Sequence, residues 1–127
     1  MKETIEEFYK SNTADESQVI SDLALDVDLD DIFLAADDVA EERRRKASEV
    51  VTEHRKEIVD KVSYWTGARR SLVKTLVEAI ARKVDELGLV VDKNRESEQI
   101  VELTVYITTL MMNFFAARRF PDRKNGA

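Results

Sequence analysis

Basic side chains recur at four-residue steps along one stretch of the chain, interrupted by Glu78, and two aromatic residues, Tyr64 and Trp65, come just before them. Cations neutralise phosphates and aromatic rings stack on unpaired bases, so this combination is typical of single-strand binding that does not read sequence. For Trp65 itself we favour packing into the core, because a lone tryptophan usually packs. Together with a basic group after the last apolar stretch, the pattern predicts a nucleic-acid-binding surface of seven residues: Arg69, Arg70, Lys74, Arg82, Lys83, Arg118 and Arg119.

A single histidine, His54, stands one helical turn before Glu57. It could act as a general base or metal ligand, although a half-buried histidine that only packs is the simpler interpretation.

Four carboxylates within residues 37–42 could hold magnesium beside substrate phosphates, but without a second such cluster a solvated face is the better interpretation. The aspartates of 26–31 lack the glycine and the closing glutamate of a calcium loop. Since phosphate-loop, nucleophile and zinc-protease motifs are also missing, we expect no enzyme activity, no metal and no cofactor.

These side chains must be positioned by a fold that uses few turns. The chain has 127 residues with three glycines and one proline, which favours a single helical domain over 1–127. It has no cysteine, which excludes disulfides and cysteine-ligated zinc. No positively charged, apolar leader opens the sequence, so we expect a cytoplasmic protein.

Apolar periodicity predicts where the helices lie. The clearest stripe should begin after Gly67 and end at Gly88, because glycine commonly terminates helices. This stripe runs from Leu72 to Leu87 and predicts a helix over about 68–87. The pattern also predicts helices over about 2–10, 14–26 and 31–66, the last with a stripe that includes Ala36 and Ala40.

The last helix should begin near Glu96 and end at Pro121. It carries no charge between Leu103 and Ala117 and is apolar in nearly every direction, so we expect it to be surrounded by the other helices. The uncharged run is too short, and too rich in threonine, for a membrane span. The fold class we predict is therefore all-α, a four- to five-helix bundle with a buried C-terminal helix.

The net charge of −6 conceals two unequal parts. Residues 1–42 hold 14 Asp and Glu against 2 Lys, a charge of −12, whereas residues 43–127 hold 12 Asp and Glu against 18 Lys and Arg, a charge of +6. An acidic N-terminal segment joined to a basic helical body is typical of proteins with a polyanion-binding surface. The alternative is that charged helix faces simply alternate in solvent.

Two segments resemble a known family. GARRSLVKTLVEAIARKV over 67–84 and AARRFPDR over 116–123, together with the chain's size and helix order, resemble the small subunits of CRISPR effector complexes of the Cascade type. The likeness covers about the last 60 residues. It implies a non-catalytic subunit of antiviral defence, whose copies stack along the complex and offer basic rows to the guide–target duplex or the displaced strand.

These patterns predict a non-catalytic, nucleic-acid-binding accessory subunit of a larger ribonucleoprotein assembly. Its partners would be other protein subunits or copies of itself, and the backbone of single-stranded DNA or RNA, with no membrane. The alternative is a helical protein-interaction module, such as a homodimeric adaptor or regulator, without nucleic-acid binding. There the apolar surplus of residues 103–117 would complete a partner interface.

Overall fold

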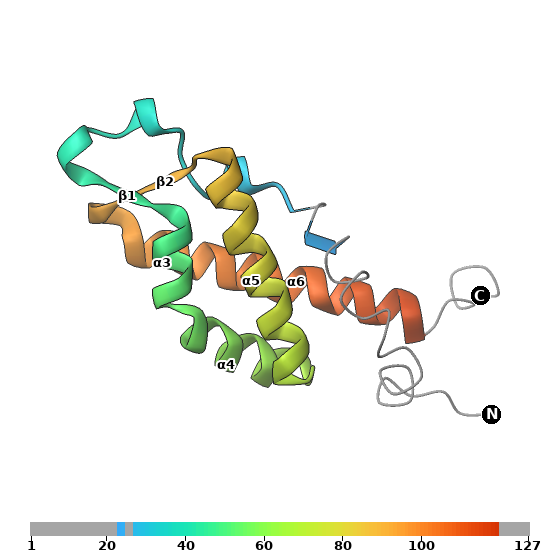
Figure 1. The fold of residues 1–127 in the computed structure, drawn as a ribbon. Coiled ribbons are helices and arrows are strands. Elements are labelled where there is room, and N and C mark those ends of the chain that lie inside the picture. The colour runs from blue at the N-terminus through green and yellow to red at the C-terminus, as the bar shows by residue number, and fades with distance from the viewer. Residues whose placement is uncertain (1–22, 25–26, 120–127) are drawn as a thin grey trace.

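The computed structural model describes residues 23–24 and 27–119, with side chains described as far as Phe114. Helices dominate this part of the chain, which confirms the all-α class. Its long elements are α3 (Ala47–Glu53), α4 (Arg55–Thr66), α5 (Arg70–Leu87) and α6 (Glu96–Arg119) (Figure 1). The helix predicted over 2–10, nearly all of that over 14–26, and the stop at Pro121 lie outside the described residues.

Helix α5 forms as its periodicity predicts. Gly67 ends α4 and Gly88 ends α5, at φ 74° and 68°, in the left-handed conformation that a Cβ atom disfavours, and α5 begins at Arg70, three residues after Gly67. Only the last predicted stripe position fails, since Leu87 is 53% exposed. The other stripe residues are buried: Leu72, Val73, Leu76, Val77, Ile80 and Val84.

The long helix predicted over 31–66 is wrong in its first half. The stripe predicted there relied on Ala36 and Ala40, whose small side chains supply little burial energy. The larger apolar side chains of the segment are buried without helical spacing: Ile32, Phe33 and Val39. The backbone forms 3-10 turns and a strand instead: η1 (Leu29–Asp31), η2 (Ala36–Asp38), η3 (Glu41–Arg43) and β1 (Arg44–Lys46).

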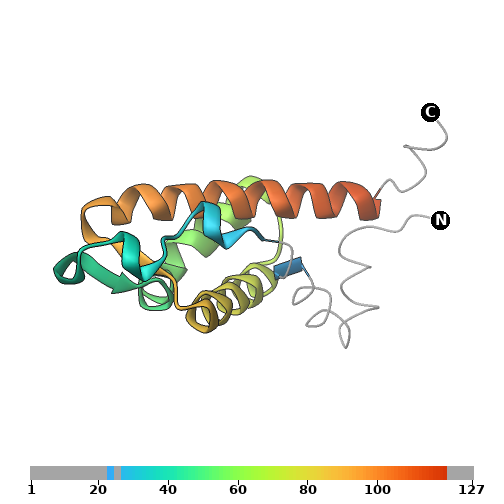
Figure 2. The same ribbon diagram turned by 90° about the horizontal axis from the view of Figure 1, so that it is seen from above.

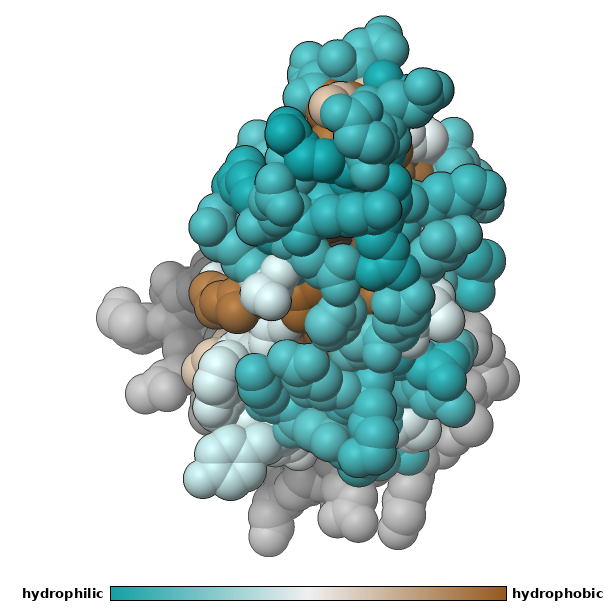
Figure 3. All heavy atoms as spheres, turned by 90° about the vertical axis from the view of Figure 1, so that its left-hand side faces the viewer, coloured by the Kyte–Doolittle hydropathy of each residue, from teal (hydrophilic) through white to brown (hydrophobic). Residues whose placement is uncertain are grey.

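A two-stranded antiparallel sheet holds this segment against the connection between α5 and α6. Strand β1 pairs with β2 (Val90–Asp92), and the turn η4 (Lys93–Arg95) then leads into α6. Leu34 adds a bridge to Val90, through mutual backbone hydrogen bonds of 2.9 and 2.8 Å. Figure 3 views the molecule from the side on which the sheet lies, and most of the surface seen there is hydrophilic.

The second half of the predicted long helix is broken at His54. The backbone there has φ −95° and ψ 8°, so α3 ends and α4 begins at this residue, without a glycine or proline. Helix α3 packs on α5 and on both strands, whereas α4 packs on α5 and α6. The break therefore lets one run of sequence cover two sets of neighbours.

Helix α6 runs along one edge of the molecule (Figure 2). The prediction that it is covered all round is wrong, because Val101, Val105 and Met112 are 54%, 51% and 53% exposed. Its inner face is buried, as predicted, at Ile100, Leu103, Ile107 and Met111. No helix in the described part of the chain is long and apolar enough to cross a membrane.

Candidate functional site

The turn between α4 and α5 gathers part of the predicted nucleic-acid-binding set. Helix α4 ends at Thr66, and α5 begins at Arg70. The Thr66 hydroxyl donates to the Val62 carbonyl at 2.7 Å and accepts from the Ala68 amide at 3.1 Å, which fixes the turn. We call the surface around this turn the corner surface, and it consists of Tyr64, Trp65, Arg69, Arg70 and Lys74.

Both aromatic rings of the corner surface are exposed, Tyr64 by 84% and Trp65 by 51%. The interpretation that Trp65 packs into the core is therefore wrong. Helix α4 buries Ile58, Val59 and Val62, and Trp65 follows them in the final turn, where the helix leaves the core. Exposed Trp and Tyr beside arginine are enriched at recognition surfaces.

Arg70 spans from α5 to α4. Its Nη1 forms an ion pair with Oδ1 of Asp60, and this pair, with a further contribution from Lys56, lowers the pKa of the Asp60 carboxyl. The Arg70 and Asp60 side chains are 57% and 42% exposed, and exposed pairs contribute little to stability. Tyr64 lies one turn after Asp60 on the same face of α4. Arg70 can thus exchange Asp60 for another anion at small cost.

The basic row on α5 continues away from the corner surface. Lys74 and Arg82 are exposed, and eight residues of helix separate them by about 12 Å. Glu78 lies between them, and its Oε2 is 3.2 Å from Nη1 of Arg55 on α4. The row is therefore partly neutralised halfway along.

The other predicted residues lie elsewhere. Lys83 is half-buried, and its Nζ is 3.5 Å from the carbonyl of Ala24, so it reaches toward the N-terminal segment. Arg118 and Arg119 are the last residues of α6, and their side chains lie outside the described part of the chain. The turn therefore gathers three of the seven predicted residues, Arg69, Arg70 and Lys74.

A second charged group surrounds the helix break at His54. Nε2 of His54 is 2.9 Å from Oε2 of Glu96, and Nδ1 is 3.2 Å from Oε1 of Glu57. Arg45 of β1 donates to Oε1 of Glu96 at 2.7 Å and to Oε2 of Glu53 at 2.5 Å. The sequence shows the His54–Glu57 spacing, but Arg45 and Glu96 are brought in by the sheet, which periodicity does not reveal. The carboxylate of Glu96, at the start of α6, therefore contacts both Arg45 on β1 and His54 at the break between α3 and α4.

Hydrogen bonds are the largest cause of the pKa shifts of His54, Glu57 and Glu96. The bond to Glu96, followed by that to Glu57, raises the pKa of His54 against an opposing contribution from burial. The same bonds lower the pKa of both carboxyls. A neutral imidazole has one N–H, whereas the imidazolium can donate to both carboxylates. This arrangement suits a charged structural clamp better than a base or metal ligand, because both ring nitrogens are already engaged.

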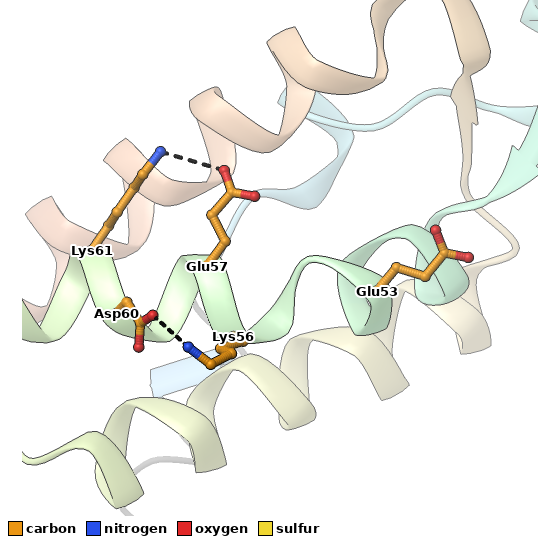
Figure 4. Close-up of a pocket in the computed structure, with 5 residues that line it drawn as sticks. All are labelled: Glu53, Lys56, Glu57, Asp60 and Lys61. Carbon is orange, nitrogen blue, oxygen red and sulfur yellow. Dashed lines mark hydrogen bonds and ion pairs between the residues drawn. The ribbon is translucent and has the colours of Figure 1, made fainter.

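An open depression along α4 is lined entirely by charged residues (Figure 4). Lys56 pairs with Asp60 at 3.2 Å, and Lys61 pairs with Glu57 at 3.3 Å. The fifth lining residue, Glu53, is the partner of Arg45. These pairs leave little unmatched charge for a small molecule.

The predicted acidic cluster also holds no metal site. Asp37 and Asp38 lie on η2, and Glu41 and Glu42 lie on the separate turn η3, all exposed. Within residues 23–24 and 27–119, no three His, Asp or Glu side chains are grouped so that they could hold a metal ion.

Comparison with known proteins adds no identification: no family model, no curated protein sequence and no solved structure matches this chain.

Proposed function

We propose that the protein is a non-catalytic, nucleic-acid-binding accessory subunit, and that its corner surface binds single strands. The observation that carries this proposal is the exposure of Tyr64 and Trp65 beside the basic start of α5. Rings in this position can stack on bases, while Arg70 and Lys74 neutralise phosphates. Binding of this kind has little sequence preference and a steep dependence on salt.

For Arg70 to bind a phosphate, its ion pair with Asp60 must be broken, and the free-energy cost of this step limits the affinity. A phosphate that approaches Arg70 replaces a carboxylate partner that is itself 42% exposed. The exchange therefore costs little. Asp60 also disfavours a phosphate nearby, so affinity should be modest and should depend on multiple contacts or on an assembly.

The charge division along the chain supports a subunit role. The segment 1–42 carries −12 and the rest carries +6. The acidic segment would dock on a basic face of a neighbouring subunit or cover the chain's own basic face. Membership of a CRISPR-type antiviral complex, suggested by the resemblance of 67–84 and 116–123, is the most specific form of this proposal.

Fluorescence anisotropy with a labelled single-stranded oligonucleotide at about 50 and 200 mM salt tests the proposal. Trp65→Ala should weaken binding about tenfold, because losing one stacked base costs about 1–3 kcal/mol. Leu87→Ala is the matched control, since Leu87 is 53% exposed at the other end of α5.

A second pair of variants tests the charge contribution. Lys74→Glu should weaken binding and reduce the salt slope by about one. Lys93→Glu, an exposed lysine of η4, is its control and should have little effect. No binding at about 50 mM salt, or equal losses in variant and control, would refute the corner surface.

The second candidate function is a helical protein-interaction module. The exposed apolar residues of α6, Val101, Val105 and Met112, favour it. The two candidates are separable, because Lys74→Glu should weaken strand binding and leave any self-association unchanged.

A further inference from the structure

One row of apolar residues on α6 is only partly covered by the rest of the described fold. Val101, Val105 and Met112 are each about half exposed. Helix α6 packs mainly on α4, and Figure 2 shows α6 running along one edge of the molecule. Exposed apolar groups in a row mark interaction surfaces more often than scattered ones do.

The row has the spacing of a coiled-coil seam. The positions 101, 105, 108 and 112 are separated by four, three and four residues, which is the alternation of d and a positions in a heptad. Thr108 fills the third position. Its hydroxyl donates to the Thr104 carbonyl at 2.9 Å, so its proton is satisfied within the helix and needs no partner across a seam.

Charge at the two ends of α6 selects the orientation of a helical partner. The first two turns carry two exposed glutamates, Glu102 and Glu98, of which Glu98 also pairs with Arg95, and the sequence places Arg118 and Arg119 at the last two positions. A parallel copy would set like charges side by side. An antiparallel copy sets acidic ends beside basic ends and also opposes the helix dipoles favourably.

We propose that α6 pairs antiparallel with α6 of a second copy of this chain, through Val101, Val105, Thr108 and Met112. The pairing is isologous. Val101 of each copy faces Met112 of the other, and Val105 faces Thr108. The seam is small, so the dissociation constant should be on the order of micromolar. This proposal concerns a different helix from the corner surface and does not depend on nucleic-acid binding.

Sedimentation of the full-length chain from about 1 µM to a few hundred µM brackets such a dissociation constant. The mass should rise with concentration from 14.6 kDa toward twice that value. Val105→Glu should weaken association at least tenfold, because it places two buried charges in the seam. Leu87→Glu is the matched control, a half-exposed apolar residue on α5 that should leave the mass curve unchanged. A monomer at every concentration, or a dimer indifferent to Val105→Glu, overturns the proposal.

Orientation is tested with single cysteines, since the chain has none of its own. In a mixture of Val101→Cys and Met112→Cys proteins, oxidation should link the two different variants. Two copies of Val101 lie about 16 Å apart along an antiparallel pair, beyond disulfide reach, so Val101→Cys alone should stay unlinked. A predominant Val101→Cys homodimer overturns the antiparallel arrangement.

If the Val105→Cys protein proves to be a monomer, alkylation of its thiol shows what else covers the row. If its thiol resists alkylation, another part of the same chain covers the row. If it reacts freely, the row is open to a different partner. Both outcomes overturn pairing with a second copy.

Discussion

The chain changes direction twice between α3 and α5, at His54 and at Gly67, and it does so by two different means. At Gly67 the backbone makes the turn by adopting φ 74°. At His54 the backbone keeps a negative φ, and side chains hold the bend through Glu57 and Glu96. The aromatic rings just before the first turn, Tyr64 and Trp65, are left exposed, whereas the charged side chains at the second are bound into the fold.

The difference shows where a binding surface can form. The Gly67 turn, closed by the short Thr66 side chain, leaves the rings of Tyr64 and Trp65 exposed and commits Arg70 only to the exposed carboxylate of Asp60. A bend held by hydrogen-bonded charges commits those charges to structure. The residue type best suited to chemistry, His54, is therefore the less available one, and the candidate interface lies at Gly67.

The largest effect should come from breaking the clamp at the His54 bend. Glu96→Ala removes the acceptor shared by Arg45 and His54, and leaves two partly buried donors without it, so unfolding free energy should fall by about 2 kcal/mol. Denaturant unfolding measures this. Glu98→Ala, in the same first turn but exposed and paired with Arg95, should change stability by less than about 0.5 kcal/mol. Equal losses in the two variants would remove the distinction between the turns.

A backbone change at the other turn should have a smaller effect. A Cβ at Gly67 would meet no atom within 4 Å, so Gly67→Ala carries only the cost of the left-handed conformation, about 1 kcal/mol. Gly67→Asn should cost less, because Asn tolerates that conformation. Thermal unfolding of both variants gives the comparison. If Asn proves worse than Ala, backbone conformation is not what the glycine supplies.

Smaller still is the pH dependence of the His54 clamp. The pKa of His54 is raised in the folded state by Glu96 and Glu57, which in turn contact Arg45 and Lys61. The stabilisation is therefore complete below the unfolded pKa of about 6.5 and is lost as pH rises through the folded pKa. Unfolding free energy should be lower near pH 8 than near pH 6. The decrease should vanish in His54→Gln, which controls for every other titrating group because His54 is the only histidine.

The smallest stability effect should be at the corner surface itself. Trp65→Ala should alter unfolding free energy by less than about 0.5 kcal/mol, because the ring is half exposed. Ile58→Ala, buried in the same helix, should cost about 2 kcal/mol or more. A large loss from Trp65→Ala in chemical denaturation would mean that this ring is structural and not available to a ligand.

The sequence predicts the parts of this fold that follow local rules. Helix α5 has a continuous stripe of large apolar residues between two glycines, and its bounds follow from that pattern. The segment 29–46 has no such pattern, because its shape depends on pairing with Val90–Asp92, about half the sequence away. The bend at His54 is equally hidden, since Glu96, the carboxylate that joins it to Arg45, lies 42 residues further along the chain.

The candidate site was predictable to a similar degree. Proximity of Arg69 and Arg70 to Tyr64 and Trp65 follows from the Gly67 turn alone. Exposure of Trp65 does not, because it depends on where α4 leaves the core. The position of Lys83 was also beyond sequence reasoning, since the residue it reaches, Ala24, belongs to the N-terminal segment.

The short sheet also has a consequence for the order in which the protein folds. The helices α3, α4 and α5 follow one another along the chain and can pack through contacts between near neighbours. Arg44, by contrast, meets Asp92 only after a loop of nearly fifty residues has closed. Closing such a loop costs entropy before any pairing repays it, and long-range pairing slows folding. The helices should therefore assemble first, and the strand pair, with the segment that it holds, should be the last part to form and the first to open.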